Sequence, residues 1–210
     1  MIGIIDYGLG NIRAIKNIYY KLNVPCSIIN NIDDLLKSDK LILPGVGAFD
    51  WAMECLNRSG MRKPLDELVL KKSVPVLGIC VGMQIMANSS EEGKSEGLGW
   101  INAKVTRFDL SRFENIQIPH MGWNSIMAEN NHPLISNINH HKGFYFLHSF
   151  YFECDDQLHE IAYSNHGHNF SAAVSKNNIM GVQFHPEKSH TNGIRVFKNF
   201  AELEACSVQE

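Results

Sequence analysis

The pattern of hydrophobic and polar positions differs between the two halves of the chain. In the first half, short apolar runs alternate with segments whose apolar residues recur every three or four positions. Short β-branched runs are typical of buried strands, and the wider spacing is typical of amphipathic helices. The predicted strands are residues 2–5, 25–30, 40–43 and 74–79, and the predicted helices are residues 11–22, 32–37, 50–57, 62–71 and 83–87.

This alternation predicts an α/β fold with a mostly parallel central sheet flanked by helices, in which functional side chains gather at the carboxyl ends of the strands. The second half carries shorter strand candidates between polar turns, which predict an antiparallel extension of the sheet. These candidates are residues 101–108, 143–148, 150–154, 161–165, 170–175 and 179–184. A closing helix over 191–202 is expected to pack Ile194, Phe197, Phe200 and Leu203. With no linker or repeat, we expect one domain over residues 1–210.

Composition narrows the possible partners. The net charge of −3 gives no electrostatic footprint for nucleic acid or an anionic membrane, and no apolar stretch approaches the roughly 18 residues of a membrane span. The first residues lack the pattern of a signal peptide, and the five scattered cysteines suit reduced thiols, so we expect a cytoplasmic protein. The absence of a CxxC pair argues against a zinc site. The histidine pairs 140–141 and 166/168 are interpreted as solvated turns, so we expect neither a metal nor a cofactor.

Cys80 is the first candidate for chemistry. It lies between the predicted strand 74–79 and the predicted helix 83–87, with Gly78 and Gly82 on either side. This arrangement is typical of a nucleophile elbow, where a sharp turn presents the nucleophile and the glycines avoid Cβ clashes. A following helix N-terminus would favour the thiolate and offer free N–H groups. Taken alone, the pattern favours a small cysteine buried in the core over a catalytic one. The assignment therefore depends on the residues that could act with Cys80.

His185 and Glu187 are the expected partners. His185 follows the predicted strand 179–184 and would share the rim with Cys80 if that strand joins the sheet in parallel. Glu187, two residues further on, can accept a hydrogen bond from the imidazole and fix its tautomer. A thiol nucleophile needs a base, and the base needs an orienting acceptor. The sequence therefore predicts that Cys80, His185 and Glu187 are catalytic.

An oxyanion hole is expected beside the thiol. The segment 44–47, Pro-Gly-Val-Gly, follows the strand before the Cys80 strand, and its glycines permit a backbone N–H to turn toward the sulfur. We predict that the N–H groups of Val46 and Val81 form the hole.

A second glycine pattern, Gly8-Leu9-Gly10-Asn11, is similar to a dinucleotide fingerprint. The third glycine position is Arg13, and no acidic residue ends the second strand. Because a side chain there disturbs close helix–strand packing, a plain glycine turn is favoured over nucleotide binding.

Taken together, the motifs resemble the class I, triad-type glutamine amidotransferases, and within them the glutaminase subunits of imidazole glycerol phosphate synthase. The resemblance extends from Ile2 to about Phe200. The motifs that carry it are residues 5–11 (IDYGLGN), 43–49 (LPGVGAF), 78–84 (GICVGMQ), 96–99 (EGLG), 119–124 (PHMGWN), 145–149 (YFLHS) and 184–187 (FHPE).

The resemblance implies a glutaminase with a Cys-His-Glu triad and a thioester intermediate. Ammonia would pass to a (β/α)8-barrel cyclase subunit in a heterodimer, which makes imidazole glycerol phosphate and aminoimidazole carboxamide ribotide in histidine biosynthesis. It also implies that the 44–47 loop stays inactive until the partner binds its nucleotide, with Gly45 and Gly47 permitting a backbone flip. The residues implied to bind glutamine are Gly47, Gln84, Glu92, Ser149 and Phe150, and those implied to face the partner or the ammonia exit are Pro119, Met121, Trp123, Asn124 and Tyr145.

Several alternatives remain open at this stage. Departures from the family pattern, such as Val81 for a common Leu and Phe150 for a common Tyr, leave the ammonia acceptor undecided. A paralogous glutaminase could feed a synthase that amidinates a bacterial surface sugar. The chain could also be a free-standing cysteine hydrolase, or a non-catalytic module with a structural Cys80 and a nucleotide at the Gly8–Gly10 turn. Trp123 and Tyr145 could simply be core aromatics.

Overall fold

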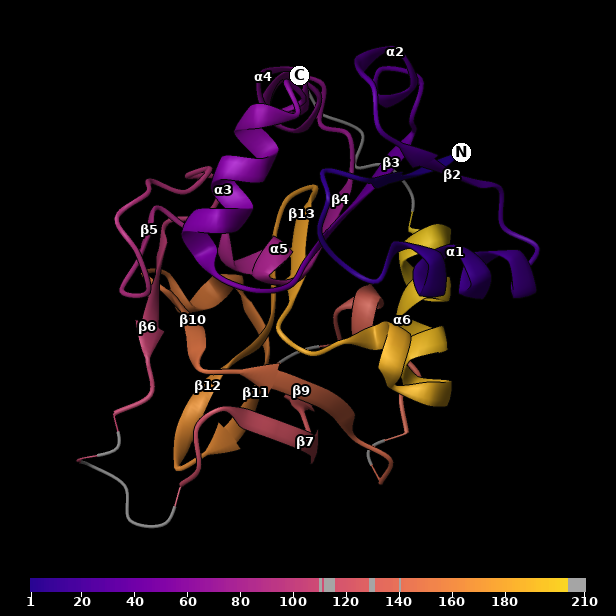
Figure 1. Cartoon of the computed structure of the whole chain (residues 1–210). Helices are drawn as coiled ribbons and strands as arrows, with labels where there is room; N and C mark the ends of the chain where they lie inside the picture. The colour runs from indigo at the N-terminus through magenta and orange to yellow at the C-terminus, as the bar shows by residue number, and fades with distance from the viewer. Residues whose placement is uncertain (110, 112–115, 129–130, 140, 204–210) are drawn as a thin grey trace.

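The first half of the chain forms a parallel sheet, as the computed structural model shows for the residues it describes, 1–109, 111, 116–128, 131–139 and 141–203 (Figure 1). Strands β2, β1, β3 and β4 lie side by side in that order and are parallel throughout. The elements are β1 (Ile2–Ile5), α1 (Ile12–Lys21), β2 (Cys26–Ile29), α2 (Ile32–Leu35), β3 (Lys40–Gly45), α3 (Phe49–Arg58), α4 (Arg62–Asp66) with a π-helical turn (Glu67–Lys71), β4 (Val76–Cys80) and α5 (Val81–Gln84). The α/β prediction is confirmed.

The second half adds a parallel strand and then antiparallel ones. Strand β13 pairs in parallel with β4, and β12, β10 and β6 follow it as antiparallel neighbours. The elements are β5 (Ser89–Ser90), β6 (Ala103–Arg107), β8 (Met127–Ala128), β10 (Phe150–Cys154), β11 (Glu160–His166), β12 (His168–Lys176), β13 (Ile179–Val182) and 3-10 turns at Pro133–Ile135, Gln157–His159 and Pro186–Lys188. Because β13 runs parallel to β4, its carboxyl end lies on the same rim as Cys80.

A separate two-stranded ribbon lies outside this sheet. It consists of β7 (His120–Asn124) and β9 (Phe144–His148), which pair antiparallel at the lower edge of the view in Figure 1. The sequence predicted β9 but not β7. The reason is that β7 has a glycine at its centre, and its polar residues fall on the buried face, so its pattern is not that of a half-buried strand.

Helix α6 (His190–Glu202) closes the molecule beside α1. Phe197 is fully buried and meets Tyr19 edge-on, with ring centroids 5.3 Å apart. The expectation for Ile194 was wrong, since its side chain is 39% exposed while Val196, Phe197 and Phe200 form the buried face. Within the part of the chain that the structure describes, every helix is too short or too polar to cross a bilayer.

Two local predictions need correction. The helix after Cys80 begins directly at Val81 and ends at Gln84, so it is a single turn and not residues 83–87. His166 and His168 are half-buried in the β11–β12 hairpin, where both rings contact Phe108, so they are only partly solvated. Of the other histidine pair, His140 lies outside the described residues.

Candidate active site

Cys80 lies at a sharp turn between strand and helix. It is the last residue of β4, its backbone has φ 55° and ψ −114°, and the residue is 3% exposed. A residue other than glycine at positive φ costs of order 1–3 kcal/mol and occurs mainly where the surrounding structure holds it for function. The structure thus has the elbow geometry that the sequence predicted around this cysteine.

Glycines let the elbow approach the neighbouring strand. A Cβ on Gly82 would lie 1.9 Å from the Leu43 carbonyl oxygen, and one on Gly45 would lie 2.3 Å from the Gly82 nitrogen. Gly45 belongs to β3 and pairs with Cys80, so β3 extends two residues beyond the prediction. Gly47, at φ +89°, has open space around it. The backbone freedom expected of both glycines therefore belongs to Gly47.

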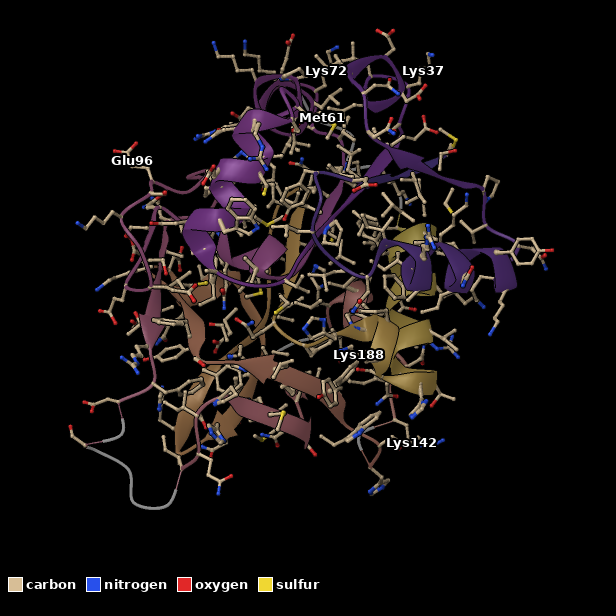
Figure 2. The ribbon with its side chains drawn as sticks, in the orientation of Figure 1. Lys37, Met61, Lys72, Glu96, Lys142 and Lys188 are labelled. Carbon is tan, nitrogen blue, oxygen red and sulfur yellow. The ribbon has the colours of Figure 1, made fainter. Side chains whose placement is uncertain are left out.

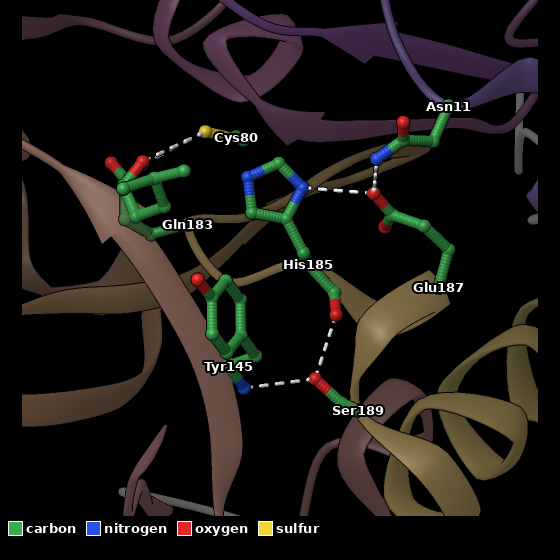
Figure 3. Close-up of polar contacts among 8 residues, drawn as sticks. Asn11, Cys80, Tyr145, Gln183, His185, Glu187 and Ser189 are labelled. Atoms are coloured by element: carbon green, nitrogen blue, oxygen red, sulfur yellow. Dashed lines mark hydrogen bonds and ion pairs between the residues drawn. The ribbon is translucent and has the colours of Figure 1, made fainter. Parts of the chain in front are cut away.

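His185 and Glu187 form a buried hydrogen-bonded pair beside Cys80 (Figure 3). His185 Nδ1 lies 2.9 Å from Glu187 Oε1, and their side chains are 3% and 2% exposed. The same carboxylate oxygen accepts a hydrogen bond of 2.7 Å from Asn11 Nδ2. Asn11 was not predicted as a site residue, although it ends the Gly8–Gly10 turn. That turn therefore delivers a side chain to the Cys80 site.

The interactions of His185 with Cys80 and Glu187 stabilise the charged forms of His185 and Glu187. Burial alone would lower the pKa of His185, but hydrogen bonds and charge from Cys80 and Glu187 raise it to about 10. Burial would likewise raise the pKa of Glu187, but the hydrogen bond and charge of His185, with the Asn11 amide, lower it. These interactions favour the protonated form of His185, whose second ring nitrogen lies on the Cys80 side (Figure 3).

Strand β9 fixes the main chain of His185 on both sides. The His185 N–H donates to the Tyr145 carbonyl at 2.8 Å. Ser189 Oγ donates to the His185 carbonyl at 2.6 Å and accepts from the Tyr145 N–H at 3.0 Å (Figure 3). The imidazole is thus held by the ribbon as well as by Glu187.

A cavity of about 380 Å³ opens beside the thiol, a size typical of small-molecule sites. It brings together residues from loops far apart in the sequence. Its lining includes Cys80, His185, Val46, Val81, Gly47, Gln84, Glu92, Ser149, Phe150 and Pro119, which are predicted site residues, together with Asn11, Leu147, His148 and Lys188.

Two of the lining side chains are already partly engaged. Gln84 is 3% exposed, and its Nε2 donates to the Phe150 carbonyl at 2.9 Å and to Gln183 Oε1 at 3.0 Å. Only its oxygen can meet a ligand. Glu92 accepts the Phe49 N–H at 2.8 Å with one carboxylate oxygen, at the start of α3. It therefore connects the cavity wall to the helix that follows the 44–47 loop.

Comparison with known proteins agrees with this geometry. A family model described as glutamine amidotransferase class-I matches residues 3–203. Imidazole glycerol phosphate synthase subunit HisH of Bdellovibrio bacteriovorus is 51% identical over 204 residues, which cover 97% of this chain and 100% of that protein. The chain belongs to the HisH family of class-I glutamine amidotransferases.

Further relatives support the same assignment. Subunit HisH of Leptospira interrogans is 47% identical, with 97% of this chain and 100% of that protein covered. A solved structure described as a glutamine amidotransferase matches with a TM-score of 0.71 at 18% identity, covering 96% of this chain and 99% of that one. PurLQS from Thermotoga maritima matches with a TM-score of 0.68, also at 18% identity, covering 95% and 96%. At such identity these two matches show the fold alone. The family model and the HisH relatives show that the chain is an enzyme of the class-I glutamine amidotransferases.

The residues predicted to face a partner of this HisH-family chain lie mainly on one face of the ribbon. Met121 and Trp123 on β7 are 66% and 49% exposed, and they pair with Leu147 and Tyr145 on β9. Trp123 is therefore not a core aromatic. Asn124 lies on the opposite, inner face, where its amide bonds the Asn165 carbonyl at 2.8 Å and His120 at 3.2 Å.

Lys188 and His190 contact aromatic rings of this face. Lys188 Nζ lies 5.3 Å from the centroid of the Tyr145 ring, and the Trp123 ring stacks on His190 at 5.2 Å. Figure 2 labels Lys188 and Lys142 in this region of the molecule. The apolar face, defined as Met121, Trp123, Tyr145 and Leu147, is called the ribbon face below.

Proposed function

We propose that this chain hydrolyses glutamine to glutamate and ammonia at Cys80 and supplies the ammonia to a cyclase subunit of the (β/α)8-barrel type. The two chains would form a heterodimer that makes imidazole glycerol phosphate and aminoimidazole carboxamide ribotide in histidine biosynthesis. The observation that carries the proposal is the buried alignment of His185 and Glu187 beside a cysteine held at positive φ. The HisH relatives support the choice of pathway.

The first half-reaction forms a thioester. Cys80 Sγ, having given its proton to His185, attacks the carbon of the glutamine side-chain amide. The negative charge that forms on the amide oxygen is stabilised by the N–H groups of Val46 and Val81. His185 then gives its proton to the amide nitrogen, the C–N bond breaks, and ammonia leaves.

The second half-reaction returns the enzyme to its starting state. His185 removes a proton from a water molecule, whose oxygen attacks the thioester carbon. The tetrahedral intermediate collapses, the C–S bond breaks, and Cys80 leaves as a thiolate with glutamate released. Glu187 keeps the imidazole oriented and stabilises its positive charge in both halves.

The ribbon face is the proposed contact with the barrel subunit. Its apolar side chains lie next to the cavity, because Leu147 belongs to both. Contiguous exposed apolar side chains with a polar rim mark interaction sites, and the neighbouring Lys188 suits acidic groups on the partner. A free-standing hydrolase would leave this face without a role.

The test is glutamate release from glutamine by the chain alone, with a cyclase-type barrel subunit, and with that subunit plus its phosphoribosyl-nucleotide ligand. We expect slow release by the chain alone and strong stimulation by subunit plus ligand. Full activity of the chain alone would indicate a free-standing amidase. No stimulation by the barrel, despite a reactive Cys80, would point to the sugar-amidating partner.

A further inference from the structure

Gln183 is a buried polar residue that the mechanism above does not use. It follows β13, two residues before His185, and is fully buried. Its Nε2 lies 3.8 Å from Cys80 Sγ, within hydrogen-bonding distance for a sulfur acceptor. It is therefore the one amide side chain, among the described residues, with a hydrogen bond to the proposed nucleophile.

The orientation of the Gln183 amide follows from its neighbours. The Phe150 carbonyl can only accept, so the Gln84 atom 2.9 Å from it must be the amide nitrogen. That nitrogen also contacts Gln183 at 3.0 Å, so the Gln183 atom there must be its oxygen. The Gln183 nitrogen is consequently the atom that faces the sulfur, and it donates.

The same carbonyl orients a second group of side chains. His148 Nδ1 lies 2.8 Å from the Phe150 oxygen and must donate, which leaves its Nε2 as an acceptor for His120 Nδ1 at 3.0 Å. Burial lowers the pKa of His148 to about 3 and that of His120 to about 4, so both rings are neutral, as this arrangement requires. Both lone pairs of the Phe150 oxygen are thus used, and it fixes Gln84 in place.

Cys80 benefits from a donor besides His185, because its sulfur has little contact with solvent. The residue is 3% exposed, and α5 is a single turn, too short for a substantial helix dipole. The Leu147 carbonyl, 3.9 Å from the sulfur, favours the neutral thiol because it can only accept. An N–H group on the other side shifts the balance toward the thiolate.

We propose that Gln183 is a catalytic residue that donates a hydrogen bond to the Cys80 thiolate, with Gln84 and the Phe150 carbonyl holding its amide in the required orientation. The inference rests on the proposed function, since it assigns a role in that reaction. The hydrogen bond acts when the thiolate forms and again when the thiolate leaves the thioester carbon.

The test measures the Cys80 thiolate in the free chain at pH 7. Ultraviolet thiolate absorbance is compared with and without Cys80→Ala, so that the difference reports this cysteine among the five. In Gln183→Met we expect the ratio of thiolate to thiol to fall about tenfold, the lower range for a hydrogen bond to a charged group. Alkylation of Cys80 by iodoacetamide should slow by only about fourfold, because a less stabilised thiolate is more nucleophilic.

Two further variants distinguish a hydrogen bond to the Cys80 thiolate from a general loss of packing in the core. Asn178, at the opposite end of β13, is also a buried amide and donates to the Val69 and Val74 carbonyls at 2.9 Å. Asn178→Leu should lower the unfolding temperature and leave the Cys80 thiolate ratio unchanged. Gln84→Met keeps Gln183 but removes the hydrogen bond that orients its amide, so it should lower the thiolate ratio by a smaller factor. If Gln183→Met does not fold, Gln84→Met replaces it as the test variant.

The outcomes are distinguishable. An unchanged thiolate ratio in Gln183→Met, an equal fall in Asn178→Leu, or a parent chain without a Cys80 thiolate would each overturn the inference. If Gln183→Met does not fold, an unchanged ratio in Gln84→Met overturns it. A parent chain that has the thiolate, loses it in Gln183→Met, and yet releases no glutamate with any partner would remove the proposed function and leave the role of Gln183 intact.

Discussion

The two sides of Cys80 are built in opposite ways. On the side of β3 and α5, backbone meets backbone, and Gly45 and Gly82 are there because no Cβ fits. On the side of β9 and β13, the buried polar side chains of His185 and Gln183 face the sulfur, and His148 lines the cavity beside it. The first side sets where the sulfur lies, and the second sets its charge.

This difference predicts how each side responds to change. A glycine at a backbone contact has no tolerance for a larger residue, since neither chain can move far. A buried polar group tolerates a change of shape better than the loss of its partner. Substitutions on the first side should therefore affect folding, and those on the second should affect chemistry and pH dependence.

Cys80→Ala acts where the two sides meet and should have the largest effect. We expect glutamine hydrolysis with the barrel subunit to fall by about a million-fold, as for other enzymes that lose a nucleophile, because no other group can form the thioester. The free energy of unfolding should change by less than about 1 kcal/mol. Glutamate release and urea denaturation measure the two. Retained turnover would remove Cys80 as the nucleophile.

Gly82→Ala tests the backbone side. The added Cβ would lie 1.9 Å from the Leu43 carbonyl oxygen, so the free energy of unfolding should fall by about 3 kcal/mol. Gly60→Ala is the control, because Gly60 at φ +73° has open space, and only the backbone conformation is disfavoured, by about 1 kcal/mol. Urea midpoints compare them. Equal losses would mean that the close approach of α5 to β3 is unimportant.

His148 tests the polar side through pH. Its pKa is lowered to about 3 in the folded chain, while an unfolded histidine binds a proton near pH 6.5. The unfolded state therefore binds more protons below pH 6.5, and stability falls as the pH falls. Between pH 6.5 and pH 5 this residue should cost about 1.5 kcal/mol of unfolding free energy.

The matched variant is His148→Gln, which keeps a donor for the Phe150 carbonyl but does not titrate. Between pH 6.5 and pH 5, the unfolding free energy of the variant should fall by about 1.5 kcal/mol less than that of the parent chain. Parallel curves for the parent and the variant would show that His148 is not held neutral.

Trp123→Ala should have the smallest effect on the chain itself. Trp123 is 49% exposed, so the unfolding free energy should change by less than about 1 kcal/mol. With the barrel subunit, glutamate release should persist while product formation from glutamine falls, since the ribbon face would no longer seal against the partner. Phe146→Ala, on the buried face of the same ribbon, should instead cost about 3 kcal/mol. If Trp123→Ala unfolds, Trp123 contributes to folding and not to the partner contact.

Much of the fold and the proposed triad could be read from local patterns. Cys80 and His185 each follow an apolar run, and the parallel pairing of β4 with β13 places both on one rim. Other residues could not be predicted in this way. Asn11 lies 176 positions from Glu187, and its contact depends on how the turn before α1 meets the Pro186–Lys188 turn. Strand β7 was missed because its pairing with β9, and not its own composition, makes it a strand.

The sequence by itself determined the alternation of elements, the glycine-flanked cysteine, and the short His-Pro-Glu segment, because each depends on residues a few positions apart. Only the tertiary structure decided which polar groups are donors and which are acceptors around the sulfur. Gln84 and Gln183 are 99 positions apart, and both are oriented by one carbonyl of Phe150. Hydrogen-bond direction is passed from group to group through contacts in space, and the order of residues along a chain does not contain it.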